Sequence, residues 1–205
     1  MKPFSVFLIL ACTCIVSNSF AQQGQMSMNL NYSVNTPTGT FKSDVVSKTS
    51  FRGWNAALLY GITNHVSVGL QAGFNDYSEN YPRQVYDTKD GAISAVLTNA
   101  VHTIPIQAKV KYNFVPSGFI QPYVGAGVGG NLVTFNEYLG EFSSNSKSGF
   151  YFAASPEAGV TIPFGRGSGA GFTLGANYNY MPFNYGDIKN LNNWGAFAGI
   201  KFPLK

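Results

Sequence analysis

Hydrophobic and polar residues alternate one by one along most of the chain, with the apolar residues at even-numbered positions. In residues 26–34, for example, Met26, Met28 and Leu30 alternate with small or amide side chains. A repeat of two residues is that of a β-strand between two different surroundings, not that of a helix. The alternation recurs in eight segments and predicts strands at about 26–35, 52–63, 66–76, 101–114, 119–132, 150–162, 171–180 and 193–203.

The gaps between the expected strands alternate between long and short. The second and fourth gaps are tight turns, at Asn64-His65 and at 115–118, and the sixth is a glycine-rich stretch of intermediate length. Barrels of the outer membrane have short periplasmic turns and long external loops, and about ten residues cross the bilayer at a tilt. We therefore expect an all-β fold, an eight-stranded antiparallel up-and-down transmembrane β-barrel. Its long external gaps are 36–51, 77–100, 133–149 and 181–192.

The apolar even-numbered face is expected to meet lipid. A soluble lipocalin-like barrel, with its apolar face inside, is the alternative. Two observations oppose it: the odd-numbered face is crowded with glycine and amide residues, and aromatic residues gather at the strand ends, as in membrane girdles. At the loop ends these are Trp54, Phe150, Phe152, Tyr180 and Trp194, and at the turn ends Tyr112, Phe114, Phe164 and Phe202.

The first 21 residues have the features of a secretory signal peptide. Lys2 precedes an apolar run from Phe4 to Val16, and Ser19-Phe20-Ala21 offers small residues at a cleavage site before Gln22. A lipoprotein signal ending before Cys12 is the alternative, although Leu10 fits that site poorly. We expect a signal peptide at 1–21 and a barrel domain at 22–205, a mature chain of 184 residues.

Composition excludes several classes of function. Both cysteines lie in the expected signal peptide, so the mature chain has no disulfide, thiolate metal site or cysteine nucleophile. Charged residues make up only 11% of the chain, and the small positive excess is scattered, which argues against binding nucleic acid. The glycine-rich segment 125–131 lacks the lysine and following helix of a phosphate-binding loop. We expect no cofactor and no metal.

Four charged residues share the inward, odd-numbered phase: Lys109, Lys111, Glu157 and Lys201. Counted from the external strand ends, Lys109, Glu157 and Lys201 fall at similar depth. We predict that Glu157 pairs with Lys109 and Lys201 in a charge network that plugs the lumen, because an unpaired buried ion is costly. A gate that opens when the pair rearranges is the alternative. The expected polar neighbours are Gln71, Gln107, Gln121, Asn177 and Asn179.

The two histidines provide little support for catalysis. His65 falls in a tight turn, where it needs no further explanation. His102 is in the outward phase near the external rim, and a site with Asp87 or Asp90 and Ser94 is the remaining enzymatic alternative. We expect no catalytic residues.

The stretches IPIQAKVKYNF (104–114), IQPYVGAGVGGN (120–131) and ASPEAGVTIPFG (154–165) resemble small eight-stranded outer-membrane β-barrel proteins of Gram-negative bacteria. These stretches are similar in composition and pattern to the Bacteroidota branch of the OmpA/OmpX/OmpW-like group. The aromatic C-terminal residue that is usual in the group is replaced by Lys205. The resemblance implies location in the outer membrane and insertion by the outer-membrane assembly machinery. The group includes structural proteins, adhesins, narrow channels and a few lipid-modifying enzymes, so fold alone does not decide function.

We therefore expect a monomer with a structural or surface-interaction role, and a narrow channel for small or hydrophobic solutes as the alternative. A lipid-modifying enzyme is a remote alternative. The expected partners are outer-membrane lipids, lipopolysaccharide and an extracellular ligand on the loops. The longest gap, 77–100, carries Tyr77, Tyr81, Tyr86 and three acids, Glu79, Asp87 and Asp90, suited to such contacts.

Overall fold

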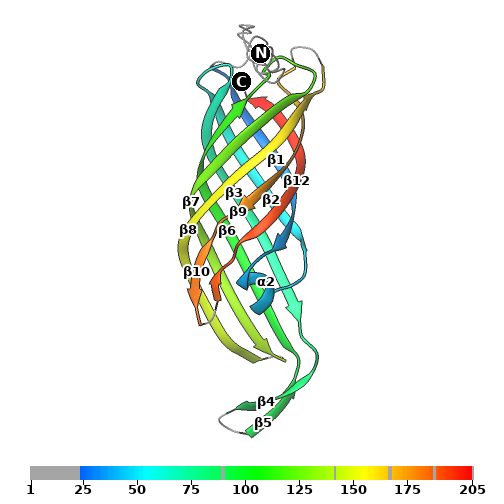
Figure 1. The fold of residues 1–205 in the computed structure, drawn as a ribbon, viewed down its shortest axis with the longest axis vertical. Helices are drawn as coiled ribbons and strands as arrows, with labels where there is room; N and C mark the ends of the chain where they lie inside the picture. Colours follow the sequence, from blue (N-terminus) through cyan, green and yellow to red (C-terminus); the bar gives the residue numbers. More distant parts are fainter. Residues whose placement is uncertain (1–23, 89–90, 141, 166–167, 187, 205) are drawn as a thin grey trace, which may run out of the picture.

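The computed structural model describes residues 24–88, 91–140, 142–165, 168–186 and 188–204, and the expected signal peptide and its cleavage site lie outside them. Eight antiparallel strands close into a barrel when the last pairs with the first (Figure 1). The predicted fold class is confirmed. The strands are β1 (Met26–Pro37), β2 (Ser50–Gly61), β3 (Val66–Asn80), β6 (Leu97–Asn113), β7 (Gln121–Leu139), β8 (Phe142–Pro163), β9 (Gly171–Asn179) and β12 (Asn193–Leu204).

Several strands continue beyond the ends predicted from the sequence, by several residues on the loop side and by at most one on the turn side. β7 and β8 have 19 and 22 residues, and their pairing extends to Leu139 and Phe142. The expected loop 133–149 is therefore largely strand, and that prediction was wrong. The sequence contrast disappears there because outward residues such as Thr134 and Ser148 are polar. A strand that has left the lipid has water on its outer face and keeps its ladder without an apolar stripe.

The other long gaps contain small elements of their own. The short helix α2 (Thr40–Asp44) lies between β1 and β2, and the hairpin of β10 (Pro182–Tyr185) and β11 (Ile188–Asn190) lies between β9 and β12. A second hairpin, β4 (Gln84–Thr88) with β5 (Gly91–Ala95), projects beyond the barrel at the loop end (Figure 1). Among the described residues, no helix is long and apolar enough to cross a membrane.

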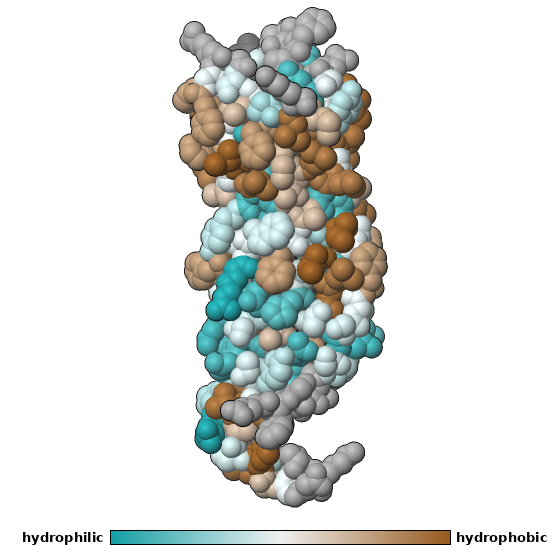
Figure 2. Space-filling view, turned by 180° about the vertical axis from the view of Figure 1, so that it is seen from behind, coloured by the Kyte–Doolittle hydropathy of each residue, from teal (hydrophilic) through white to brown (hydrophobic). Residues whose placement is uncertain are grey.

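The outer face carries the predicted apolar belt. On the face seen in Figure 2, hydrophobic residues gather in the half of the barrel nearer the short turns, and hydrophilic residues follow toward the loops. Leu70 in the middle of β3 is 64% exposed. The aromatic residues expected in the two girdles are exposed as well, apart from the half-buried Phe202: Trp54, Phe150, Phe152, Tyr180, Trp194, Tyr112, Phe114 and Phe164.

A row of polar residues ends the belt on the loop side. Asp76 lies opposite His102 in the register, and its Oδ2 accepts a hydrogen bond from Arg52 Nη1 at 3.1 Å. Toward the loops, Arg52, Asp76 and His102 are the next outward-facing residues beyond Trp54, Phe74 and Ile104, respectively. They lie on the neighbouring strands β2, β3 and β6. Because charged groups are expensive in hydrocarbon, this row marks where the lipid-facing surface gives way to water.

Leu70→Arg is expected to lower the free energy of unfolding by about 2–4 kcal/mol, because it places a cation near the middle of the apolar belt. Urea titration of the protein in lipid vesicles, followed by the gel-mobility shift between folded and unfolded forms, measures this difference. Ser148→Arg, on the exposed outer face beyond the belt, is the control and should change little. Equal unfolding midpoints for the two variants would contradict the assignment of the belt to lipid.

Candidate functional site

The middle of the barrel lumen holds a buried ion pair. Lys109 Nζ, on β6, lies 2.8 Å from Glu157 Oε2, on β8, and both side chains are less than 10% exposed. Lys109 Nζ also donates a hydrogen bond to Gln71 Oε1 at 2.6 Å. The lysine therefore has two acceptors in a place where an unpaired charge would be costly.

Glycines of the intervening strand make room for this pair. β7 pairs with both β6 and β8, and its inward positions at this level are Gly125 and Gly127. A Cβ atom at Gly125 would lie 3.1 Å from both Cγ and Oε1 of Glu157. A Cβ atom at Gly127 would lie 2.5 Å from the Gln107 Oε1 atom that accepts a hydrogen bond from Ser155. The glycines thus leave the volume that the charged and amide side chains fill.

The other two lumen lysines have different surroundings. Lys111 Nζ lies 3.6 Å from the centre of the Tyr123 ring and donates to Thr161 Oγ1 at 3.3 Å. Lys201 lines a cavity at the turn end and forms no ion pair with any residue that the structure describes. The predicted pairing of Lys201 with Glu157 is therefore not present. Counting residues along each strand ignores the stagger between tilted neighbouring strands in a barrel. The predicted depth of Lys201 relative to Glu157 was wrong for this reason.

The predicted amide neighbours also separate into groups. Gln71 and Gln107 belong to the central level, whereas Gln121 donates to the carbonyl of Pro116 in a turn at 2.9 Å. Asn177 donates to Asn179, and Asn179 donates to Asn193, each at 2.7 Å. These last three form a chain of amides along β9 and β12, apart from the ion pair.

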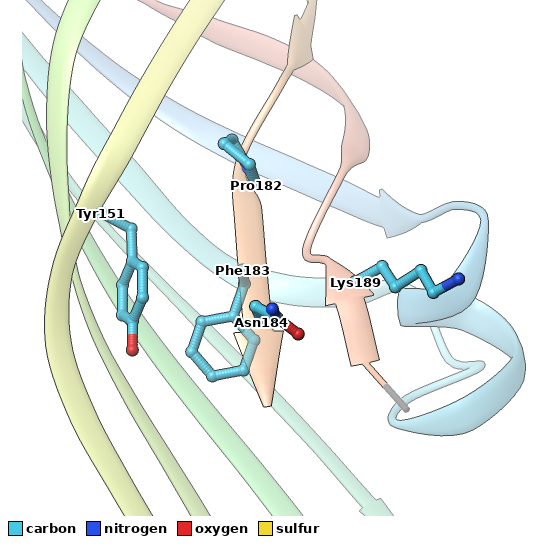
Figure 3. Close-up of a pocket in the computed structure, with 5 residues that line it drawn as sticks. All are labelled: Tyr151, Pro182, Phe183, Asn184 and Lys189. Atoms are coloured by element: carbon cyan, nitrogen blue, oxygen red, sulfur yellow. The ribbon is translucent and has the colours of Figure 1, made fainter. Parts of the chain in front are cut away.

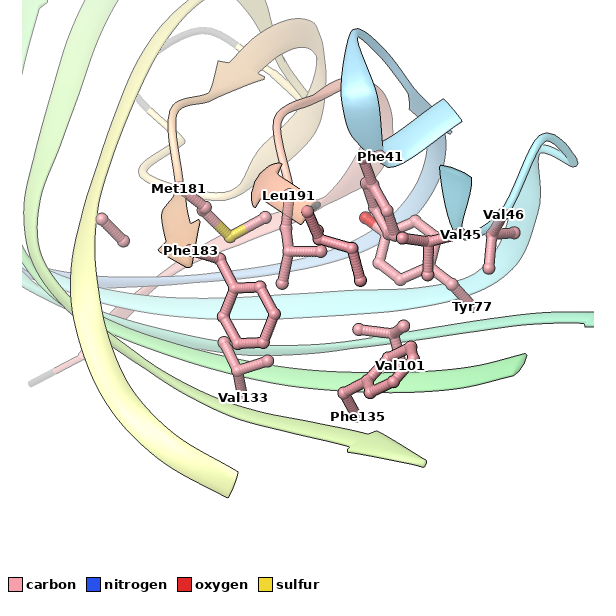
Figure 4. Close-up of a cluster of buried hydrophobic side chains, with 12 residues drawn as sticks. Phe41, Val45, Val46, Tyr77, Val101, Val133, Phe135, Met181, Phe183 and Leu191 are labelled. Carbon is pink, nitrogen blue, oxygen red and sulfur yellow. The ribbon is translucent and has the colours of Figure 1, made fainter. Parts of the chain in front are cut away.

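The loop end of the lumen is closed by an apolar cluster, which we call the external plug. α2 and the segment after it contribute Phe41, Val45 and Val46, and the β10–β11 region contributes Met181, Phe183, Ile188 and Leu191. They pack against inward residues of the wall (Figure 4). The charge network predicted to plug the lumen does not extend to this level, where the filling is apolar. The wall residues are Tyr77, Val101, Val133, Phe135 and Ala153.

Polar contacts fix the first part of the external plug to the wall. Glu79 on β3 accepts hydrogen bonds from the backbone nitrogen and the hydroxyl of Ser47, the latter at 2.7 Å. The carbonyl of Val45 accepts from Asn99 Nδ2 at 3.0 Å and from the Tyr81 hydroxyl at 3.1 Å. Burial and the charge of Glu79 raise the pKa of Tyr81, so the hydroxyl keeps its proton for this bond.

Glu79 corrects a second expectation from the sequence. We expected Glu79 in the external loop 77–100, where it could contact a ligand, but its side chain is only 9% exposed. The loop-end extension of β3 turns this residue inward. A usable signal was present in the apolar residues of the expected external loops, such as Phe41 and Leu191, which need a surface to pack on. Alternation alone did not indicate where that surface lies.

At the turn end the lumen opens into a cavity of about 1260 Å³. Its walls come from the starts and ends of the strands and from the turns after β6 and β8. Polar lining residues include Ser27, Ser67, Gln121, Thr161 and Lys201. Side chains therefore do not fill the interior at this end of the barrel.

A smaller pocket of about 380 Å³ lies on the loop side, where β8 extends beyond the end of β9. The ladder between these strands ends at Glu157 and Asn177, and the bridge from Ala154 to Tyr180 follows. Beyond it, β8 faces the β10–β11 hairpin, and the Tyr151 ring packs edge-on against Phe183 with centroids 4.9 Å apart (Figure 3). The pocket is a break in the wall of the barrel, lined by Tyr151, Pro182, Phe183, Asn184 and Lys189.

The sequence profile of the outer membrane protein beta-barrel domain matches residues 6–202, nearly the whole chain. The chain belongs to this family. It is therefore a protein of the outer membrane of Gram-negative type. Searching curated proteins gave no match.

Two solved structures resemble this outer-membrane barrel over most of its length. Neisserial surface protein A (NspA) is 15% identical, with 87% of this chain and 95% of that chain covered and a TM-score of 0.52. OprG from Pseudomonas aeruginosa is 13% identical, with 91% and 99% covered and a TM-score of 0.59. At these identities the likeness concerns the fold alone.

Among the side chains that the structure describes, His102 contacts Asp76 and Phe74, not Ser94. Its Nδ1 lies 3.4 Å from Asp76 Oδ1, and its ring stacks beside Phe74. Ser94 is on β5, in the hairpin that projects from the barrel, and Asp90 lies outside the described residues. His65 lies in the turn between β2 and β3, and its Nδ1 is 2.8 Å from the carbonyl oxygen of Asn113 at the end of β6. In the part of the chain that the structure describes, no cluster of three metal-ligating side chains occurs.

Glu157→Gln is expected to lower the free energy of unfolding by about 3–5 kcal/mol, because it leaves the buried Lys109 without its counter-charge. Urea or thermal unfolding in detergent measures the change. Asp44→Asn removes an exposed carboxylate and is the matched control. Replacing both partners, as in Lys109→Met with Glu157→Leu, should cost less than the single change. An unchanged unfolding temperature for Glu157→Gln would show that the pair does not stabilise the barrel.

Proposed function

We propose that this protein is a closed outer-membrane barrel that stabilises the envelope and presents an external hairpin to partners, rather than a pore. The external plug carries the proposal. Its side chains come from two different connections, meet inside the loop end of the lumen and are buried there. The Lys109–Glu157 pair lies deeper in the same lumen. A solute on the barrel axis would have to displace both an apolar core and a buried ion pair.

The structure of the loop end suits a surface role. The β4–β5 hairpin projects beyond the barrel and pairs only within itself among the described strands (Figure 1). Val85 and Ile93 on this hairpin are 68% and 39% exposed. An exposed strand edge with apolar side chains can add a strand from a partner or pack against an apolar surface. The proposed partner is therefore an extracellular ligand that contacts this hairpin.

The proposed partners elsewhere follow from the outer face. The apolar belt and its girdles suit the acyl chains of outer-membrane lipids, and the polar row beyond them lies at the level of lipopolysaccharide head groups. Insertion by the outer-membrane assembly machinery is proposed from the family. We propose a monomer, because closure of the barrel leaves the membrane-spanning sheet without a free edge. The proposed role requires no catalytic residue and no cofactor.

A narrow channel for small or hydrophobic solutes is the second candidate. The wall break between β8 and the β10–β11 hairpin favours it, because it offers a pocket of about 380 Å³ lined by Tyr151, whose neighbours along β8, Phe150 and Phe152, are exposed. A solute from the membrane side would enter there rather than along the axis. The buried Phe183 stands between this pocket and the deeper lumen, so passage requires the β10–β11 hairpin to move.

Planar-bilayer recordings are expected to show no steady conductance for the unaltered protein, because the external plug fills the loop end of the lumen. Replacing residues 40–46 with a Gly-Ser linker of equal length, together with Lys109→Ala and Glu157→Ala, removes the first part of the external plug and the deeper ion pair and should produce steady openings. Replacing residues 82–96, which include the β4–β5 hairpin, with an Asn-Gly turn leaves the plug intact and serves as the control. Steady conductance of the unaltered protein would overturn the closed-barrel proposal in favour of the channel.

Complementation separates the two parts of the proposed role. In a strain that lacks the protein, we expect sensitivity to detergent to rise. Expression of the unaltered chain should restore resistance. The variant without residues 82–96 should restore resistance equally if the barrel alone stabilises the envelope. A variant that inserts normally but fails to restore resistance would place the function in the hairpin. No change in resistance on deletion of the protein would contradict the envelope-stabilising role.

A further inference from the structure

The cavity at the turn end has a cation without a counter-ion. Lys201, on the inward face of β12, lines it and forms no ion pair with any described residue. Lys111 lies behind the cavity wall, where it donates to Thr161, which is itself a lining residue. Glu157 is already paired with Lys109. Lys201 is therefore left without a carboxylate at ion-pair distance among the described residues.

Because Lys201 has no counter-ion in the part of the chain that the structure describes, we expect the solute that enters the cavity to be an anion. Removing a cation from bulk water is costly unless a counter-charge or several hydrogen bonds replace the lost solvation. The cavity opens at the turn end, where the described chain also begins and ends, so a solute in the periplasm has access to it. An anion that enters gains the attraction of Lys201. The hydroxyl groups of Ser27 and Ser67 line the same cavity as Lys201 and can donate hydrogen bonds.

The rest of the lining indicates the size and polarity of the ligand. Phe119, Phe164 and Leu204 line the same cavity and are 80%, 56% and 37% exposed. Pro163 and Pro203 add further apolar surface. A volume of about 1260 Å³ is far larger than an inorganic anion needs and is in the range of organic ligands. The lining thus combines a cationic interior group with apolar side chains.

We propose that this cavity is a periplasm-facing binding site for an amphiphilic carboxylate. The carboxylate accepts hydrogen bonds from Lys201 and the serine hydroxyls of the lining, and the hydrocarbon part contacts Phe119, Phe164 and Leu204. The site lies at the opposite end of the barrel from the external plug and the β4–β5 hairpin. It therefore does not depend on the proposed surface role, and the two can fail separately.

Octanoate is the probe, because it carries both features and remains soluble in water. Titration calorimetry of the mature chain in lipid nanodiscs is expected to show saturable binding, with empty nanodiscs as the baseline. Lys201→Gln should weaken binding by about 10- to 100-fold, the usual contribution of a hydrogen bond to a charged group. Lys147→Gln, which removes an exposed lysine on the loop side, is the matched control and should leave binding unchanged.

A second variant tests the cavity without changing any charge. Ser27→Trp places a ring in the cavity and should abolish octanoate binding, while the gel-mobility shift confirms folding of both variants. Octanol binding as tightly as octanoate, or unchanged binding by Lys201→Gln, would overturn the proposal. If inorganic phosphate bound with the same affinity as octanoate, the ligand would not be an amphiphile. The cavity would then be a site for free anions.

Discussion

The fold depends on one constraint: within lipid, each backbone N–H and C=O must find its partner inside the protein. Pairing of β12 with β1 meets this constraint, because it removes the two edges that an open sheet would present. Closure also gives each strand one face toward lipid and one toward the lumen. The strict alternation of residue types along the chain is the direct result, and it weakens where the strands leave the lipid, as at Thr134 and Ser148.

Closure creates a second problem, since the narrow interior must be filled without leaving unpaired charges. The barrel solves it differently at each level. In the middle, Gly125 and Gly127 give up their side-chain volume to the Lys109–Glu157 pair and its amide neighbours. At the loop end, apolar residues from two connections pack inside the wall. At the turn end a cavity remains, and Lys201 lines it.

These levels make the barrel asymmetric along its axis. The external end is closed by side chains that belong to the connections themselves, so the same segments that could contact the exterior also close the lumen. The other end is open and carries positive charge. A closed exterior with an accessible interior cavity fits a protein that acts at both membrane surfaces without joining them. The β4–β5 hairpin on one side and the cavity at Lys201 on the other are the places where such contacts would occur.

The alternation of residues determined the number of strands, because burial in lipid acts on each strand separately with a period of two. The alternating gap lengths gave the antiparallel order, and the glycine, amide and aromatic residues indicated which face meets lipid. The alternation also placed Lys109 and Glu157 in the lumen. Only the tertiary structure decided that Lys201 stands apart from them, since stagger between tilted strands fixes depth and no single strand encodes it. The same holds for Phe41 and Leu191, whose packing surface exists only after the barrel has closed.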